Sequence, residues 1–288
     1  MILSSPSVII PMPIEVSTRI QALDQEEFHA LDRRIMGVVF EVHNELGRLL
    51  DEDLYKREIA TRCLAINLEP AELEVRILVG HEGFVKDYFM DLLVCRGYLM
   101  EAKVADRLVA AHRGQTLNYL LLTGLRHGRL VNLRTERVQH EFVSTTLTPE
   151  ERRRFSVVED GWVEMTAESR QLKARTIELL EDWGAFLDVS LYREALVHFL
   201  GGAGSVCKAV EVFSGSRRVG TQNLNLLDED TGFALTTKRE GAGAMRDHLG
   251  RLLEHTRLKA IQWINLNRHR VEFTTLSKDR ACGSGVRN

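Results

Sequence analysis

The sequence predicts an α/β protein of two similar units, each a mixed β-sheet flanked by helices. The chain has 288 residues, about twice the size of a common single domain. Helical and strand-like patterns of apolar residues alternate along the first half. Segments of that half then recur, in the same order, in the second half. These three observations together favour a tandem duplication of one α/β unit.

The first unit is expected at residues 31–143, after an N-terminal extension at 1–30. Its pattern is two helices, three strands joined by hairpins, a helix and two strands. In chain order these elements are helices at 31–46 and 52–66, strands at 75–79, 88–94 and 98–100, a helix at 109–125, and strands at 130–133 and 138–143. Gly47 follows the first helix, at the position where glycine commonly ends a helix.

The repeat is visible in three blocks. LGRLLDEDLYKREIA at 46–60 aligns with WGAFLDVSLYREALV at 183–197, with identical glycines (Gly47, Gly184) and tyrosines (Tyr55, Tyr192). DLL…GYLMEAK aligns with NLL…GFALTTK, and VNLRTERVQHEFVSTTL resembles INLNRHRVEFTTL. The second unit is therefore expected at 170–280, and the polar segment 144–169 between the units is predicted to be a linker.

Composition excludes several classes of protein. Apolar residues make up 44% and charged residues 27% of the chain, as in ordinary globular proteins rather than disordered or collagen-like ones. No apolar run approaches the ~18 residues needed to span a bilayer, and the N-terminus lacks the basic region of a signal peptide. The four cysteines form no CxxC pair, so neither a zinc ribbon nor an iron–sulfur cluster is expected. We expect a cytoplasmic protein with reduced thiols and no membrane partner.

Charge is distributed unevenly between the halves. Residues 1–150 hold 17 Lys and Arg against 22 Asp and Glu, a balance of −5. The remaining residues hold 21 and 19, a balance of +2. The second half is the more basic, but the net charge of −3 gives no overall nucleic-acid signature.

One arrangement in the first unit needs a chemical explanation. Asp91 interrupts an apolar strand, and Glu101-Ala102-Lys103 ends the next strand ten residues later. Side chains at i and i+2 share one face of a strand, so Glu101 and Lys103 are neighbours, and Asp91 on the adjoining strand is within reach. Two adjacent carboxylates repel unless a cation holds them, and such oxygen ligands suit Mg²⁺. A buried ion pair without any ligand is the alternative that this short pattern leaves open.

The following helix carries Gln115 and Tyr119 on one face. D-x9-E-A-K followed by Q-x-x-x-Y resembles the PD-(D/E)XK nuclease superfamily, in the branch whose members carry a Q-x-x-x-Y helix. More narrowly, residues 35–143 resemble the GxxExxY family of small, mostly prokaryotic proteins. The segments that carry this resemblance are IMGVVFEVHNELGRLLDEDLYKREI, FMDLLVCRGYLMEAK and HRGQTLNYLLLTGLRHGRLVNL.

The resemblance implies a role for each matching residue. Asp91, Glu101 and the backbone carbonyl of Ala102 would bind the metal directly. Glu52, on a helix, would support the metal through water, and Lys103 would be the catalytic lysine. Gln115 and Tyr119 on the following helix would steady the site and the scissile phosphate. The sequence departs from the family pattern at two positions. Leu49 stands where the glycine that gives the GxxExxY family its name is expected, and Met90 replaces the proline before the first acid.

The second unit departs at nearly every such position. The alignment replaces Glu52 by Val189, Asp91 by Asn225, Glu101 by Thr236, Gln115 by His248 and Tyr119 by Leu252, and keeps only Lys103, as Lys238. Without two carboxylates this unit is predicted to be a catalytically inactive copy.

The leading functional hypothesis is a nuclease that uses Mg²⁺, with Mn²⁺ as a substitute, to hydrolyse phosphodiester bonds in DNA, with RNA as the other nucleic acid considered. One active site per chain is expected, in a monomeric pseudo-dimer or a homodimer. The alternative is a non-catalytic module that binds nucleic acid or protein on the same fold; the acidic balance of the first half favours it.

Overall fold

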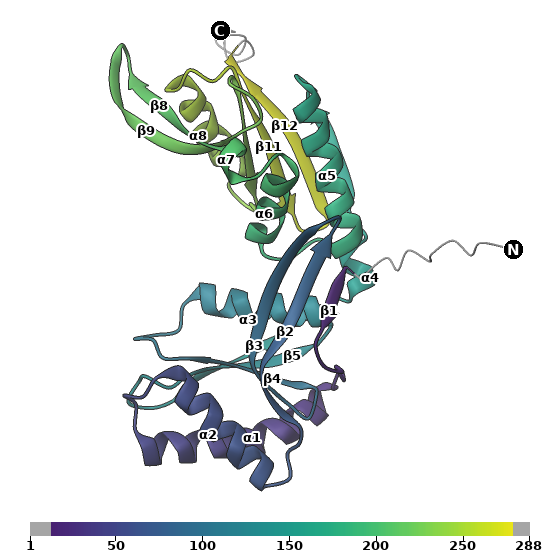
Figure 1. Ribbon diagram of the computed structural model, residues 1–288, viewed down its shortest axis with the longest axis vertical. Helices are drawn as coiled ribbons and strands as arrows, with labels where there is room; N and C mark the ends of the chain where they lie inside the picture. Colours follow the sequence, from purple (N-terminus) through teal and green to yellow (C-terminus); the bar gives the residue numbers. More distant parts are fainter. Residues whose placement is uncertain (1–12, 279–288) are drawn as a thin grey trace, which may run out of the picture. The chain divides into compact units, whose positions relative to one another are not determined.

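The computed structural model describes residues 13–278, which divide into two compact units with a boundary between Thr148 and Pro149. Unit 1 comprises the described residues up to 148 and unit 2 those from 149 onward (Figure 1). Residues 1–12 of the predicted N-terminal extension, and the last two residues of the predicted second unit, lie outside the described residues. No helix within 13–278 is long and apolar enough to cross a membrane.

Unit 1 contains six strands and three helices. They are β1 (Ile14–Val16), α1 (Gln25–Leu46), α2 (Glu52–Ala65), β2 (Ala71–His81), β3 (Phe84–Val94), β4 (Tyr98–Lys103), α3 (Ala110–Thr123), β5 (His127–Asn132) and β6 (Gln139–Ser144). The strands lie side by side in the order β1-β2-β3-β4-β5-β6. Only β4 and β5 run parallel, because α3 connects them across one face of the sheet. The other neighbouring strands are antiparallel.

Two helices cover one face of this sheet and α3 covers the other (Figure 1). α1 begins with a capping box, in which Asp24 accepts from the Glu27 amide and Glu27 accepts from the Asp24 amide. It ends at Gly47, whose φ of 71° suits glycine. Tyr55 of α2 then donates a hydrogen bond of 2.6 Å to the Gly47 carbonyl and fixes the loop between the two helices.

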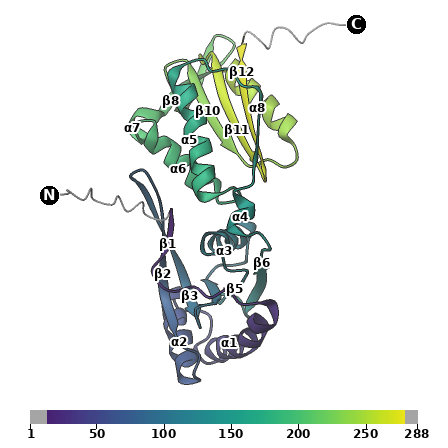
Figure 2. The same ribbon diagram turned by 90° about the vertical axis from the view of Figure 1, so that its right-hand side faces the viewer.

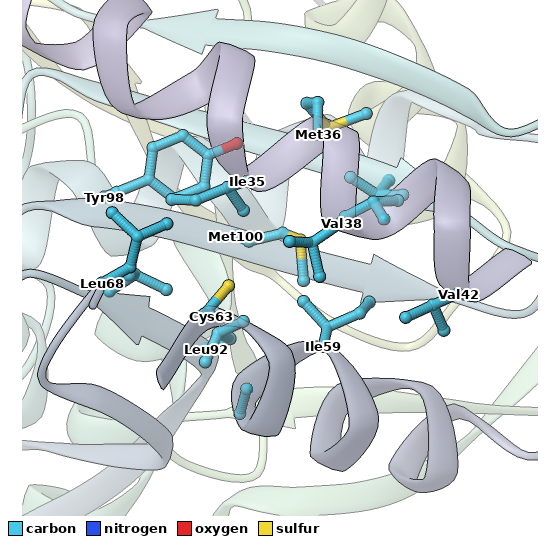
Figure 3. Packing of buried hydrophobic residues seen from close by; sticks show 14 of the residues in the cluster. Ile35, Met36, Val38, Val42, Ile59, Cys63, Leu68, Leu92, Tyr98 and Met100 are labelled. Atoms are coloured by element: carbon cyan, nitrogen blue, oxygen red, sulfur yellow. The ribbon is translucent and has the colours of Figure 1, made fainter. Parts of the chain in front are cut away.

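The core of unit 1 lies between these two helices and the sheet. Figure 3 shows apolar side chains from α1, α2, β3, β4 and the loop that follows α2 in contact there. Those labelled in the figure are Ile35, Met36, Val38, Val42, Ile59, Cys63, Leu68, Leu92, Tyr98 and Met100. Alternate residues of β3 and β4 face this core, so their neighbours in sequence face α3 instead. The positions of Glu101 and Lys103 on the α3 face follow from that alternation.

Unit 2 repeats most of this pattern. Its elements are α4 (Pro149–Arg152), β7 (Ser156–Gly161), α5 (Ala167–Trp183), α6 (Val189–Phe199), α7 (Ala203–Val206), β8 (Cys207–Ser214), β9 (Arg217–Leu226), β10 (Thr231–Thr236), α8 (Ala242–Glu254), β11 (Ala260–Asn267) and β12 (Arg270–Ser277). Its strand order is β7-β12-β11-β10-β9-β8, again with a parallel central pair, β10 and β11. Figure 2 shows α5 and α8 on opposite faces of this sheet. The predicted fold class, two mixed sheets each flanked by helices, is confirmed.

Strand pairing gives the correspondence between the units. In unit 1 the side-chain amide of Asn132 donates to the Ala105 carbonyl at 2.8 Å and its oxygen accepts from the Ala105 amide. In unit 2 Asn265 makes the same two bonds to Lys238. Lys103 pairs with Asn132 across the parallel strands, and Thr236 pairs with Asn265. Thr236 is therefore the counterpart of Lys103, and Lys238 is the counterpart of Ala105.

The predicted alignment of the second block is wrong by one or two residues. The pairing of β9 with β10 makes Leu224 the counterpart of Asp91, where the sequence alignment placed Asn225. Ala234, rather than Thr236, is the counterpart of Glu101. A shift of two residues leaves side chains on the same face of a strand, so the apolar alternation could not reveal it.

Two further predictions differ from the structure. Residues 14–16 of the predicted extension form β1, which pairs with β2, and α1 begins at Gln25 rather than at 31. The predicted linker contains α4 and β7, and β7 pairs in parallel with β12. Both strands lie at sheet edges, are short and contain no buried residue, so neither carries an apolar pattern long enough to predict a strand.

Candidate active site

The predicted site residues meet where β3 and β4 separate. The two strands pair only through residues 92–94 and 98–100. Asp91 on β3 and Glu101 on β4 lie just beyond the last pair, Leu92 with Met100. The Ala102 amide donates instead to Asp91 Oδ2 at 2.8 Å. This bond fixes the Asp91 carboxylate at the fork between the strands.

Lys103 lies between the two carboxylates. Its Nζ is 2.8 Å from Glu101 Oε1 and 3.5 Å from Asp91 Oδ2. Both acids are buried, Glu101 completely. Burial and the adjacent Asp91 charge raise the pKa of Glu101 to about 8. Burial opposes the charge of Lys103, but Glu101 and Asp91 together raise its pKa.

α2 supplies a second lysine that the sequence analysis did not assign to the site. Lys56 Nζ lies 3.2 Å from Asp91 Oδ1, 3.1 Å from Asp53 and 3.8 Å from Glu52, and it also pairs with Glu74. The i, i+4 spacing of Glu52 and Lys56 was the one available signal in the sequence. Glu52 itself is half-buried, and its pKa is raised by burial and by the Asp91 charge.

α3 places Gln115 and Tyr119 at the same site. The Gln115 amide donates to the Tyr119 hydroxyl at 2.9 Å. Burial raises the pKa of Tyr119, and the charges of Glu101 and Asp91 raise it further. The structure therefore brings together all the predicted side chains from four elements: α2, β3, β4 and α3. The predicted metal contact of the Ala102 carbonyl stays a prediction, since only the amide of that residue has an observed role here.

The donor set fits a divalent cation in one specific respect. Glu101 Oε2 is buried and has no hydrogen-bond partner, although the other oxygen of the same carboxylate binds Lys103. An ionised oxygen without a partner in a buried site is costly unless a cation or proton satisfies it. No group of three or more His, Cys, Asp or Glu side chains arranged to hold a metal ion is found within residues 13–278. Any cation here would therefore rest mainly on Asp91 and Glu101 and keep several waters, as Mg²⁺ does.

Leu49, the departure from the family glycine, falls in the loop before α2. Its side chain is 77% exposed and its backbone is not in the left-handed region. The change therefore leaves the backbone of this loop unstrained.

The corresponding position in unit 2 is apolar. Leu224 and Ala234, the counterparts of Asp91 and Glu101, pack against a cluster that includes Leu249, Leu253 and Trp263. Trp263 donates its indole N–H to the Thr236 hydroxyl at 2.9 Å. No carboxylate of unit 2 takes the place of either acid of unit 1.

Residues 29–144 match a family model described as the PD-(D/E)XK nuclease superfamily. The match covers nearly all of unit 1, and it includes every predicted site residue. The narrower resemblance to the GxxExxY family stays a prediction. Among solved structures, the crystal structure of SSO0001 is 18% identical with a TM-score of 0.23, over 39% of this chain. The match spans 66% of that chain, just under two thirds of its length. No curated protein matches the sequence.

Proposed function

We propose that unit 1 is a metal-dependent nuclease that hydrolyses phosphodiester bonds in DNA. The observation that carries this proposal is the cluster of two buried acids, Asp91 and Glu101, with Lys103, in which one oxygen of Glu101 has no hydrogen-bond partner. It lies in the segment that matches the PD-(D/E)XK superfamily model, whose nucleases generally use divalent metals. A nuclease function implies a nucleic-acid partner.

Each residue of the site would have a distinct role in the reaction. Asp91 and Glu101 would hold Mg²⁺ or Mn²⁺, with Glu52 supporting it through water and the Ala102 carbonyl as a further ligand. When bound, the cation would offset phosphate charge and activate water. Lys103, held by Glu101, would present its ammonium to the charge that develops on the phosphoryl oxygens. Gln115 and Tyr119 would orient the phosphate from α3.

Unit 2 would be an inactive copy of the same fold, derived by tandem duplication. The order of β8 to β12, the parallel central pair and the Asn265 bonds repeat those of β2 to β6, β4 with β5, and Asn132 in unit 1. The sixth strand differs, because β7 pairs with β12 at one edge whereas β1 pairs with β2 at the other. Leu224 and Ala234 supply no oxygen ligand, so a cation would have nothing to bind there. A pseudo-dimer of this kind would have one active site per chain.

The proposal is tested by cleavage of supercoiled plasmid DNA with Mg²⁺ or Mn²⁺. The Lys103→Ala variant is expected to lower the rate by about a hundredfold to a thousandfold, since it removes one donor that stabilises transition-state charge. Lys238→Ala is the matched control, because Lys238 is the counterpart of Ala105 rather than of the catalytic lysine. Absence of metal-dependent cleavage by the wild type on single- and double-stranded substrates would leave the binding-module alternative.

One site per chain also predicts the form of the product. At enzyme concentrations well below the plasmid concentration, nicked circles should accumulate before linear DNA appears, because a single site cuts one strand in each event. Gel analysis of a time course distinguishes the two forms. Direct conversion to linear DNA by a protein shown to be monomeric would contradict the assignment of a single site.

A further inference from the structure

We propose that Lys56 is a positioning residue that binds Asp91 in the metal-free protein and thereby weakens the affinity of the site for divalent metal. This inference rests on the proposed function, because it concerns the same pair of acids. Lys56 lies in the first turn and a half of α2 and is buried. A buried lysine is uncommon unless it is paired, and this one contacts four carboxylates.

The contacts of Lys56 fall into two groups. On the inner side it binds Asp91 Oδ1 at 3.2 Å, and the side chain of Asp91 is only 9% exposed. On the outer side it binds Asp53 and Glu74, whose side chains are 67% and 51% exposed. Lys56 can therefore release Asp91 and still keep two partners near solvent. Lys56 can therefore bind Asp91 when the site holds no metal and bind only its outer partners when a metal occupies the site.

Both oxygens of Asp91 are engaged in the metal-free protein. Oδ2 accepts from the Ala102 amide and faces Lys103, while Oδ1 faces Lys56. The two ammonium groups partly offset the negative charge of Asp91, which contacts both of them. A divalent cation that bound Asp91 would meet the Lys56 ammonium within a few ångströms. Two positive charges at that distance repel by more than RT even at a high effective dielectric constant.

Removal of the Lys56 charge should therefore affect the metal-free and the metal-bound protein in opposite directions, and both effects should raise the affinity for metal. The metal-free protein loses the cation that offsets its acids and becomes less stable. The metal-bound protein loses a repulsion. Metal affinity should rise, whereas disruption of the site by a purely structural defect would lower it.

The test compares Lys56→Met with the wild type in the full-length protein, using Mg²⁺ alone in isothermal titration. We expect the variant to bind Mg²⁺ about tenfold more tightly or better. In chelator, its thermal midpoint should fall below that of the wild type, and saturating Mg²⁺ should remove most of the difference. Lys56→Arg keeps the charge and should behave as the wild type. Arg57→Met removes a positive charge from the next, exposed position of α2 and should change Mg²⁺ affinity less than twofold.

The outcomes separate this inference from the proposed function. Binding of Mg²⁺ by the wild type, with equal or weaker binding by Lys56→Met, would overturn the role of Lys56 alone. Binding by Lys56→Met with none detectable in the wild type would support it most directly. No binding by either protein would overturn both proposals, and loss of binding in Asp91→Asn would show that the titration reports this site.

Discussion

Replacing Glu101 with glutamine is expected to abolish metal-dependent cleavage while stabilising the metal-free protein. Glutamine has nearly the same shape but carries no charge, so it cannot replace the ionised ligand that a divalent cation needs. We expect the cleavage rate to fall by about a thousandfold or more. The same change removes a buried carboxylate whose second oxygen is unpaired and which lies beside Asp91. Loss of activity should therefore accompany a gain in stability.

The gain should depend on pH in a defined direction. The pKa of Glu101 is about 8 in the folded protein and near 4.5 in an unfolded chain. Between these values the folded state retains a proton that the unfolded state has lost, so wild-type stability falls as pH rises, by at most ~1.4 kcal/mol per pH unit. Below 4.5 and above 8 this contribution no longer changes.

The measurement is the thermal midpoint in chelator across that window. The difference between Glu101→Gln and the wild type should be small near pH 4.5 and should increase up to pH 8. Gln115→Ala is a suitable comparison, since it alters the same site without changing its charge. A Glu101→Gln variant that is less stable than the wild type at pH 8 would contradict the burial of an ionisable Glu101.

The order of elements could be predicted where an element carries a strong local pattern. α1 buries one apolar face, β2 alternates, and β3 and β4 contain apolar runs that a few charged residues interrupt or end. The edge strands β1 and β7 could not be predicted, because neither buries a continuous face and each depends on a partner distant in sequence. Local sequence patterns were enough to predict the two units, but the edge strands of their sheets could be identified only from strand pairing in the structure.

The site shows the same division. Asp91, Glu101 and Lys103 could be found because charged residues interrupt or end apolar strands. Lys56 was missed because a lysine four residues after a glutamate is common on exposed helix surfaces. Its burial depends on the approach of β3 to α2, which no local pattern encodes. The unit 2 counterparts of Asp91 and Glu101 were also predicted wrongly. Two strands with similar sequences need not have the same pairing register with their neighbours.

A second charged cluster in unit 1 has a neutral counterpart in unit 2. Arg129 of β5 donates its Nε–H to Asp32 Oδ1 at 2.8 Å and binds the other carboxylate oxygen through a second nitrogen. Tyr98 also donates to Asp32, at 2.7 Å. Burial opposes the charge of Arg129, but the bonds to Asp32 raise the pKa of its guanidinium. All three side chains are buried.

The corresponding residues of unit 2 are Ser169 and Gln262. Gln262 occupies the strand position of Arg129, as the pairing of β11 with β10 and β12 shows. Its amide donates to the Ser169 hydroxyl at 3.1 Å, and its oxygen accepts from Thr275 at 2.7 Å. Both residues are fully buried. The same place in the fold is thus held by an ion pair in one unit and by neutral hydrogen bonds in the other.

Asp32→Ser alone is expected to destabilise unit 1 by about 3–5 kcal/mol, because it leaves the buried Arg129 guanidinium without its carboxylate. Adding Arg129→Gln removes that unpaired charge and introduces the pair found in unit 2, so the double variant should recover about 1–3 kcal/mol. The three tryptophans, Trp162, Trp183 and Trp263, all lie in unit 2, so their fluorescence follows that unit alone. Denaturant unfolding should therefore show a lower midpoint by circular dichroism, with the tryptophan transition unchanged. If the double variant were no more stable than Asp32→Ser, the two buried pairs would not be interchangeable and their equivalence would fail.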